Sequence, residues 1–424
     1  MYNHLYSFLE SNHILSNAQF GFRNGRGTAQ AIVRHTCIIY EHLDRNDLVF
    51  SLYLDFKKAF DSVDHDILLD KLLFYGIRGR PHRWFKSYLS DRRQFVHINN
   101  VKSNTCSLTH SVPQGSNLGP LLFLIYINDF PLSSNFFEFL MFADDCTLTC
   151  PIERNNLDTT HHLINQNLES IYRWTASNKI KINAQKTKFI IFSFRDQFNF
   201  NESILLGNEM IEQVTNVKFL DMFIDSNLRF QDHVNYISKI IARCLGILYK
   251  LRDFFPSNIL RSRYFTLAYP YLSYGIEVWY SAAPDYVGNQ IEILQKKIVR
   301  VIRFLDYNTH TIPHFISLKL LTIEYIFRYR VGLYMFKTIK INEFDPDLKS
   351  KPIVLSMIDT DCKQEEVANR FIVPVFNRVN SDSHIHVIGV KIYNSLPEEV
   401  TGKNSLLSFK YAYKSFLCSS LIRL

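Results

Sequence analysis

Apolar residues near the start of the chain fall into patterns that predict a buried strand followed by a helix. Residues 48–54 (LVFSLYL) are apolar without alternation, which is typical of a strand covered on both faces, and Asp55 follows at its end. Apolar positions then recur at helical spacing over residues 67–73, with Asp64 as a candidate N-cap and Gly76 as a stop signal. The pattern therefore places one carboxylate at the end of a central strand.

A second acidic position lies in a predicted β-hairpin. Residues 136–142 and 146–150 are apolar runs suited to strands, and Asp144 and Asp145 lie between them at the turn. If this hairpin and residues 48–54 share one sheet, three carboxylates come together. Such a group can hold two Mg²⁺ ions for phosphoryl transfer. The ordinary alternative is that each Asp stabilises a turn.

The remaining pattern predicts a change from mixed α/β to mainly helical structure near residue 225. The other expected elements are two strands over residues 94–99 and 105–112 around an Asn99–Asn100 turn, a buried helix over 121–126, a helix over 157–174, strands from 188 and over 217–224, and a long helix over 228–251. Later helices are separated by Pro256, Pro270 and Pro313, and we interpret a polar stretch near residues 356–367 as a linker.

Composition narrows the classes of protein to which the chain can belong. The 424 residues are 47% hydrophobic and carry a formal net charge of +8, which suits a globular protein with a polyanionic partner. The longest apolar run, residues 118–127, is interrupted by Gly119 and Pro120 and is too short to span a membrane. No basic segment followed by an apolar one lies near Met1, so we expect an intracellular protein without a secretory signal.

The seven cysteines are scattered without a C-x-x-C pair, which predicts reduced thiols rather than a disulfide framework. One spacing is compatible with zinc, and its members are Cys146, Cys150, His161 and His162. We interpret the two cysteines as packed thiols instead, because free cysteine is among the most buried residue types.

Several segments resemble the reverse transcriptases of non-LTR (LINE-type, jockey-like) retrotransposons. Three of them resemble successive palm motifs in the right order: YLDFKKAFDSVDH (residues 53–65), VPQGSNLGPLLFLIYINDF (112–130) and FADD (142–145). QFGFRNGRGT (19–28) resembles a fingers motif, KINAQKTKFIIFS (181–193) the next palm motif and KFLDMFID (218–225) the strand pair that grips the primer. Later segments similar to jockey-like elements are YGIEVWY (274–280), LQKKIVRVI (294–302) and YNSLPEEV (393–400).

This resemblance implies an α+β fold with a right-hand polymerase palm and partial fingers, followed by a mainly helical thumb and C-terminal region. The implied domains are residues 1–225 (partial fingers and palm), 226–255 (a thumb-like helix) and 256–424 (a helical C-terminal region). The implied reaction adds deoxynucleoside triphosphates to a DNA primer on an RNA template, with two Mg²⁺ or Mn²⁺ ions. A nuclear location is implied in the same way.

The resemblance also implies roles for single residues. The implied metal ligands are Asp55, Asp144 and Asp145. Lys186 is the candidate general acid for pyrophosphate; the alternative is a solvated lysine, and Lys188 is close enough to confuse the assignment. The implied nucleotide-binding residues are Arg23, Phe60, Gln114 and Gly115. Phe60 would exclude a 2′-hydroxyl unless it is simply packed in the core, and Gly115 would allow close approach of the backbone.

Basic residues lie where a nucleic-acid track is expected. After the first palm helix they alternate with the aromatic residues Trp84, Phe85 and Tyr88, and they are Arg78, Arg80, Arg83, Lys86, Arg92 and Arg93. On the long helix that follows the palm, one predicted face carries Lys239, Arg243 and Lys250, and a later helix carries Lys296, Arg300 and Arg303. A cationic helix face is most often merely solvated, but its place behind a palm favours contact with nucleic acid.

The sequence departs from the family pattern in two places. No segment resembling the upstream fingers motif RPISLL precedes Gln19, so we expect an N-terminally truncated copy or an incomplete gene. The alternative function is then a catalytically inactive nucleic-acid-binding remnant. Asp221 stands where the primer-grip turn usually has Gly, which predicts strain there. Another palm enzyme, such as an RNA-templated RNA polymerase or a nucleotide cyclase, is disfavoured by Phe60 and residues 113–120.

Overall fold

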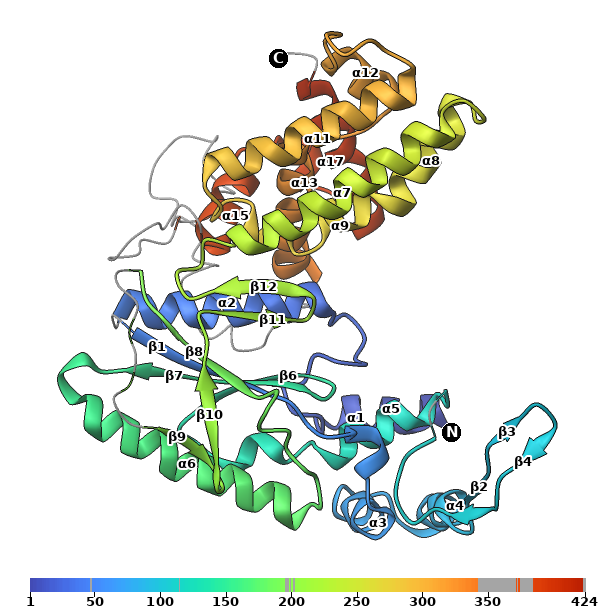
Figure 1. Ribbon diagram of the computed structural model, residues 1–424, viewed down its shortest axis with the longest axis vertical. Coiled ribbons are helices and arrows are strands. Elements are labelled where there is room, and N and C mark those ends of the chain that lie inside the picture. Colours follow the sequence, from blue (N-terminus) through green and yellow to red (C-terminus); the bar gives the residue numbers. More distant parts are fainter. Residues whose placement is uncertain are drawn as a thin grey trace. The chain divides into compact units, whose positions relative to one another are not determined.

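The structure is a computed structural model that describes residues 1–45, 48–113, 115–194, 198, 200, 203–341, 371, 373 and 384–421 (Figure 1). The chain divides into two compact units. The first contains residues 1–31 and 46–215, and the second contains residues 32–45 and 216–424. The expected linker near residues 356–367 lies outside the described residues, and the domain boundaries expected at 225 and 255 stay predictions.

The first unit is built on a six-stranded sheet with the strand order β6-β7-β1-β8-β10-β9. Its strands are β1 (Leu48–Leu54), β6 (Glu138–Phe142), β7 (Asp145–Ile152), β8 (Lys188–Phe192), β9 (Ile204–Leu206) and β10 (Glu209–Gln213). All seven residues of β1 are buried, and antiparallel neighbours β7 and β8 flank it on both edges. The continuous apolar run of residues 48–54 therefore forms a central strand, as the sequence predicts.

Helices supply the rest of the first unit's core (Figure 1). They are α1 (Tyr2–Ser11), α3 (His65–Phe74), α4 (Gly79–Leu89), α5 (Leu118–Tyr126) and α6 (Leu157–Ser177), with short 3₁₀ turns at Ala59–Ser62, Phe130–Ser133 and Arg154–Asn156. Helix α5 is buried from Leu121 to Tyr126, as predicted. Asp64 caps α3, since its Oδ1 accepts hydrogen bonds of 3.1 Å from the amides of Asp66 and Ile67.

One hairpin with two short, separate ladders replaces the longer strands expected over residues 94–99 and 105–112, and that prediction is wrong in extent. Strand β2 (Arg93–Gln94) pairs with β5 (Cys106–Ser107), and β3 (His97–Ile98) pairs with β4 (Val101–Lys102) around the predicted Asn99–Asn100 turn. All eight strand residues are exposed, so no buried face favours a longer ladder.

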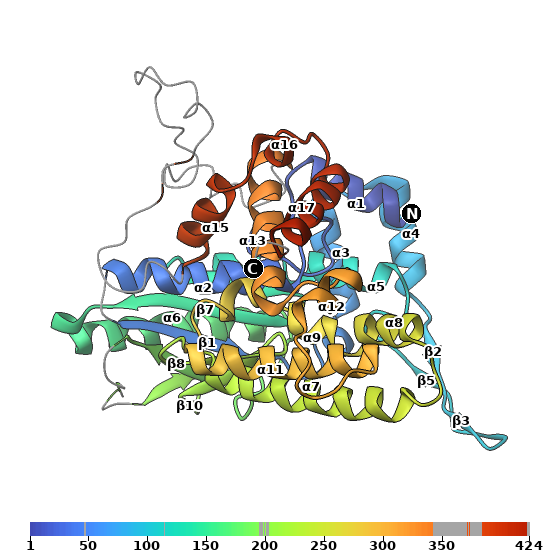
Figure 2. The ribbon, with the colours of Figure 1, turned by 90° about the horizontal axis from the view of Figure 1, so that it is seen from above.

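The second unit is mainly helical. Its elements are the larger part of α2 (Thr28–Arg45), the hairpin β11 (Asn216–Phe219) and β12 (Met222–Asp225), α7 (Gln231–Leu251), α8 (Ser257–Leu267), α9 (Tyr269–Ser273), α10 (Ile276–Trp279), α11 (Asp285–Arg303), α12 (Ile312–Ser317), α13 (Ile323–Phe336), a π-helical turn (Lys337–Ile341), α15 (Ile385–Asn394), α16 (Glu398–Thr401) and α17 (Leu406–Ser420). Helix α7 packs on α11, and α13 packs between α15 and α17 (Figure 2).

The single strand expected over residues 217–224 is instead the hairpin β11–β12, so the reading from periodicity is wrong and the strand pair implied by the resemblance is present. Leu220 and Asp221 form its turn with φ values of 45° and 62°. The conformation is the left-handed one that glycine favours, and Asp tolerates it better than most residues. Lys218 Nζ lies 2.7 Å from Asp221 Oδ1 and partly neutralises this carboxylate.

The expected fold class is confirmed: a mixed α/β palm unit is followed by mainly helical structure. Within the described ranges, no helix combines the length and the apolar character needed to cross a membrane.

Candidate active site

The register between β1 and β7 gathers the three predicted carboxylates. Leu54 at the end of β1 pairs with Cys146, so the next positions along the two strands are Asp55 and Asp145. Asp144 lies in the tight turn between β6 and β7, where Phe142 pairs with Asp145. Two residues that are 89 positions apart in sequence, Asp55 and Asp144, therefore come to the same end of the sheet.

The carboxyl of Asp144 is electrostatically strained. Burial raises its pKa, the negative charge of Asp55 raises the pKa further, and a hydrogen bond from its own amide only partly opposes both effects. Asp144 is half-buried, whereas Asp145 is exposed. Two acids that repel in a partly desolvated place are a donor set that a hard divalent cation would relieve, because Mg²⁺ binds carboxylate oxygen and neutralises its charge.

The three side chains supply the oxygen donors that such ions prefer, but their present positions do not bring all of these oxygens close together. Among the described residues, the three acids are not a group whose ligand oxygens all lie within 4.8 Å of one another. The strands fix where the backbone of each Asp lies, but each carboxylate can still turn about its side-chain bonds. Such rotation changes the distances between the carboxylate oxygens, and metal binding by Asp55, Asp144 and Asp145 stays a prediction.

A segment near the N-terminus braces the turn that carries Asp144. Gln19 is buried, and its Oε1 accepts hydrogen bonds from the amides of Gly21 (2.7 Å) and Ala143 (2.9 Å). The backbone amide of Phe20 donates to the Met141 carbonyl at 2.7 Å. Ala143 has a φ of 56°, which a residue with a side chain rarely adopts. Residues 19–21 form this bracing segment. Their hydrogen bonds offset the conformational cost, because they satisfy backbone amide and carbonyl groups of the turn.

Asp55 is braced by a different segment, residues 183–187. The Asn183 amide donates to the Asp55 carbonyl at 2.8 Å, and the Asp55 amide donates to Thr187 Oγ1 at 3.2 Å. Lys186, the predicted general acid, is exposed and directly precedes Thr187. Lys188, the competing lysine, forms an ion pair with Glu212. Lys186 is thus exposed and Lys188 is ion-paired, and the choice between them as general acid stays a prediction.

The predicted nucleotide-binding residues have different surroundings. Phe60 is half-buried; its ring stacks on Phe123 with centroids 4.4 Å apart and meets Phe22 edge-on at 6.3 Å. Gly115 has a φ of 81° and no atom within 4 Å of the position of an added Cβ, so its backbone conformation, more than close packing, requires glycine. Gln114 lies outside the described residues.

Arg23, one of the predicted nucleotide-binding residues, forms an ion pair and a hydrogen bond to the backbone within the first unit. Its guanidinium donates to both Glu10 oxygens, at 2.8 and 2.7 Å, and to the Ser16 carbonyl at 2.7 Å. Its side chain is only 7% exposed. This bidentate ion pair ties α1 to Arg23, and the nucleotide-binding role of Arg23 stays a prediction.

The basic residues expected to contact nucleic acid lie on the surface. In the first unit, Arg78, Arg83 and Arg93 are exposed, while Arg92 lies half-buried over the ring of Tyr88 at 5.7 Å. On α7, Lys239, Arg243 and Lys250 are exposed, and the apolar residues Ile237, Ile241 and Leu248 are buried. The predicted stripe is therefore confirmed as geometry. On α11, Lys296 pairs with Glu292 at 2.6 Å, and Arg300 donates to the Thr309 carbonyl at 3.1 Å.

The cysteines of the zinc-compatible spacing are packed thiols, as interpreted. Cys146 and Cys150 are buried in β7, and burial raises the pKa of both thiols. His161 Nε2 lies 3.0 Å from the Ser203 carbonyl. Among the described residues, neither cysteine belongs to a group of three potential ligands whose donor atoms all lie within 4.8 Å of one another.

Comparison with known proteins places this geometry in a family. Residues 1–224 match the family described as Reverse transcriptase (RNA-dependent DNA polymerase). The chain belongs to this family. Because the match spans the bracing segment, β1, the β6–β7 hairpin and residues 183–187, every element of the carboxylate site lies inside the reverse transcriptase region.

Named relatives agree with the resemblance to non-LTR elements. The chain is 28% identical over 341 residues to the probable RNA-directed DNA polymerase from transposon BS of Drosophila melanogaster, covering 76% of this chain and 36% of that protein. It is 28% identical over 298 residues to the RNA-directed DNA polymerase from mobile element jockey of the same species, covering 67% and 31%. The chain thus spans about a third of the length of these curated relatives.

Among solved structures, the chain is similar to telomerase from Candida albicans in complex with a fragment of telomeric RNA. The identity is 12%, the TM-score is 0.37, and the match covers 84% of this chain and 59% of the telomerase chain. This likeness is too distant to bear on function.

The brace around the Asp144 turn generates a stability prediction. A Cβ on Gly21 would lie 2.3 Å from the Ala143 amide nitrogen, a backbone atom that cannot move without displacing the turn. Gly21→Ala should therefore destabilise the chain by roughly 1–3 kcal/mol and speed amide hydrogen exchange over residues 141–146. Gly27→Ala is the matched control, because its Cβ would meet only the movable end of Gln30. Equal exchange in both variants would contradict the brace.

The raised pKa of Asp144 generates a prediction about pH. A carboxyl whose pKa is higher in the folded than in the unfolded state contributes stability at low pH and loses it as pH rises through the folded pKa. Asp144→Asn should therefore raise the Tm at pH 7 in a chelating buffer, by roughly 1–3 °C, and the gain should vanish below about pH 4. Asp145→Asn, at the exposed neighbour, should change the Tm less. A Tm for Asp144→Asn that is equal or lower at pH 7 would contradict the electrostatic account.

Proposed function

We propose that this chain carries out RNA-templated DNA synthesis, adding deoxynucleotides to the 3′ end of a DNA primer at Asp55, Asp144 and Asp145. The observation that carries the proposal is the strand register, which brings these acids together at the ends of β1 and β7. Membership of the reverse transcriptase family supports the reaction class. The names of the two Drosophila relatives support RNA as the template and DNA as the product.

The acids would act by holding divalent cations. When bound, two Mg²⁺ or Mn²⁺ ions would activate the primer 3′-hydroxyl and stabilise charge on the leaving pyrophosphate. Asp55 and Asp144 are the shared ligands in this proposal, because they repel each other across the end of the sheet. Asp145, more exposed, completes the set. The braces at Gln19 and Thr187 hold the two backbones in place, which preserves the spacing of the ligands between catalytic cycles.

Other residues would act on the incoming deoxynucleoside triphosphate. Lys186 would give a proton to the departing pyrophosphate, supported by its exposed place beside the Thr187 hydroxyl that holds Asp55. Phe60 would exclude a ribose 2′-hydroxyl, supported by a ring that packs on Phe123 while staying partly exposed. Gly115, in open space with a positive φ, would let the template or nucleotide approach the backbone.

Nucleic acid would be held by the exposed cationic residues of each unit. Arg78, Arg83, Arg92 and Arg93 offer charges beside the stacked rings of Trp84 and Tyr88, whose centroids are 5.3 Å apart. Lys239, Arg243 and Lys250 offer a row of charges on α7. A DNA primer in a chromosome would require a nuclear location, which we include in the proposal.

The decisive assay for this function is primer extension. The full chain, with Mg²⁺ or Mn²⁺, should extend a DNA primer on an RNA template, and Asp144→Asn should lower the rate on the order of 10³-fold or more, because the site loses a shared metal ligand. Glu169→Gln removes an exposed acid on α6 and should leave the rate unchanged. Binding of primer-template should survive in both variants. If the unaltered chain binds primer-template but extends it with neither metal, the chain is a binding remnant and the proposal is wrong.

The stripe on α7 gives a separate prediction about binding. Replacing Lys239, Arg243 and Lys250 together by Gln should reduce the salt dependence of primer-template binding by about two to three units of slope, near 0.9 for each lost phosphate contact. Replacing Lys410 and Lys414 of α17, together with Lys403 between α16 and α17, by Gln provides a charge-matched control. The same slope in both triple variants would mean that the α7 stripe does not contact phosphate.

A further inference from the structure

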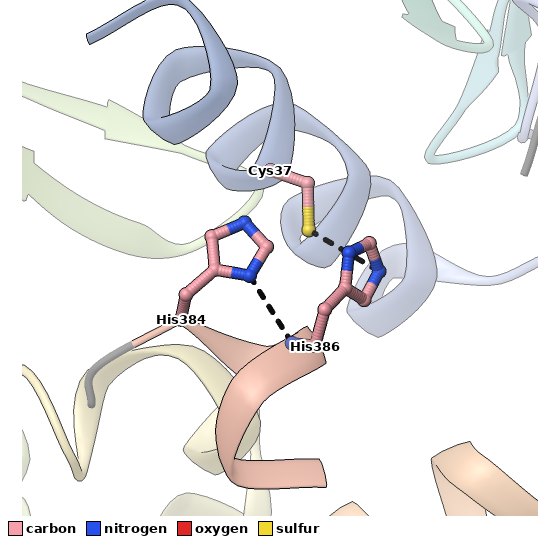
Figure 3. A group of neighbouring side chains, drawn as sticks. All are labelled: Cys37, His384 and His386. Carbon is pink, nitrogen blue, oxygen red and sulfur yellow. Dashed lines mark hydrogen bonds between the residues drawn. The ribbon is translucent and has the colours of Figure 1, made fainter. Parts of the chain in front are cut away.

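A second group of potential metal ligands lies in the helical unit, apart from the carboxylates. In the part of the chain that the structure describes, it is the one group of three or more Cys, His, Asp or Glu residues whose ligand atoms all lie within 4.8 Å of one another. Its members are Cys37, His384 and His386. Figure 3 shows the thiol of α2 and the two imidazoles at the start of α15 facing one another.

The three side chains come from distant parts of the sequence and meet in a dry place. Cys37 and His386 are 349 positions apart, yet Cys37 Sγ lies 3.9 Å from His386 Nε2. Their exposed fractions are 3% for Cys37, 2% for His384 and 4% for His386. The ring of Tyr40 packs edge-on against His384, with centroids 5.4 Å apart, and shields the group on the α2 side. Two imidazoles buried beside a thiol are unusual, because buried polar side chains normally require a partner.

The donor atoms of the group suit a transition metal, because imidazole nitrogen and thiolate sulfur are ligands that such metals prefer. A donor set of one sulfur and two nitrogens selects zinc and similar metals, and it disfavours the hard Mg²⁺ that suits the carboxylates.

We propose that Cys37, His384 and His386 form a zinc site that fastens α2 to the start of α15. Binding would release the proton of the Cys37 thiol to solvent, leaving a thiolate on the metal. The three protein ligands would fill three positions of the tetrahedral shell that zinc prefers. The site joins an N-terminal helix to a C-terminal one within the second unit, so its role is to stabilise that unit.

Only small changes separate the present arrangement from a coordinated one. Tetrahedral bonds to zinc place sulfur and nitrogen roughly 3.5 Å apart, slightly less than the observed 3.9 Å. His384 Nδ1 accepts a hydrogen bond of 3.1 Å from the His386 amide, which caps α15. A neutral imidazole has one acceptor nitrogen, so coordination by His384 would replace this cap. Loss of one cap is a small effect beside the coordination of zinc.

Cobalt substitution tests the proposal on the full chain. With excess Mg²⁺ present to occupy the carboxylates, one equivalent of Co²⁺ should produce a thiolate-to-cobalt absorption band that Zn²⁺ then removes. Cys37→Ser should abolish the band, and His386→Gln should weaken Co²⁺ binding at least about tenfold. The matched controls Cys244→Ser and His233→Gln alter a buried thiol and a buried imidazole on α7 and should keep the band. No band, or a band unchanged in Cys37→Ser, would overturn the proposal.

A measurement on the unaltered chain guards against variants that fail to fold. X-ray absorption of the chain loaded with one equivalent of Zn²⁺ should give one sulfur at about 2.3 Å and two imidazole nitrogens at about 2.0–2.1 Å. A shell of nitrogen and oxygen alone would mean that Cys37 is not a ligand and that the group is a buried thiol–imidazole contact without metal.

Discussion

The antiparallel pairing of β1 with β7 is the constraint on which the candidate site depends. Leu54 opposite Cys146 fixes Asp55 and Asp145 as the next positions on the two strands. A slip of one residue would turn the apolar face of β7 away from the core and move its acids away from Asp55. Because β1 is buried throughout and flanked by β8 on its other edge, the register is strongly specified. The packing of the core therefore sets the place of the acids.

The register brings together groups that repel, and the rest of the site compensates. Burial and the charge of Asp55 both disfavour ionised Asp144, so the arrangement costs stability in the absence of a cation. Gln19 holds the turn that carries Asp144, and Thr187 holds the amide of Asp55. Both braces act on backbone atoms. The carboxylates keep the freedom to turn toward a metal, while the strands that carry them do not move apart.

The local sequence pattern predicted local structure, but it did not predict contacts between residues that are distant in the sequence. The Asp64 cap, the buried run 48–54 and the Asp144 turn are each encoded within about ten residues, and all three are present. Nothing in the pattern pairs Gln19 with Ala143, 124 positions away. The ion pair between Arg23 and Glu10, 13 positions apart, was not predicted for the same reason. The strands observed between residues 94 and 112 are shorter than the predicted ones, because apolar residues alone do not make a hairpin buried.

The second ligand group also depends on a contact between distant residues, so the sequence did not predict it. Cys37 carries no local metal-binding pattern, and its histidine neighbours lie near the other end of the chain. The spacing that did suggest zinc, around Cys146, belongs to buried thiols of a central strand. The two ligand groups differ in chemistry as well as in place. Oxygen donors lie in the palm unit, and sulfur and nitrogen donors lie in the helical unit, so hard and soft metals would not compete for the same side chains.

The central claim is that Asp55 and Asp144 bind the same metal ions, and metal-directed cleavage of the backbone tests it most directly. Fe²⁺ substituted for Mg²⁺ in the full chain, with ascorbate and peroxide, generates radicals that cut the polypeptide next to the bound ion. The account predicts two cuts, near residues 55 and 144, that appear together, are suppressed together by excess Mg²⁺ and are both lost in Asp144→Asn. Cutting at only one of these two positions would contradict a shared metal site.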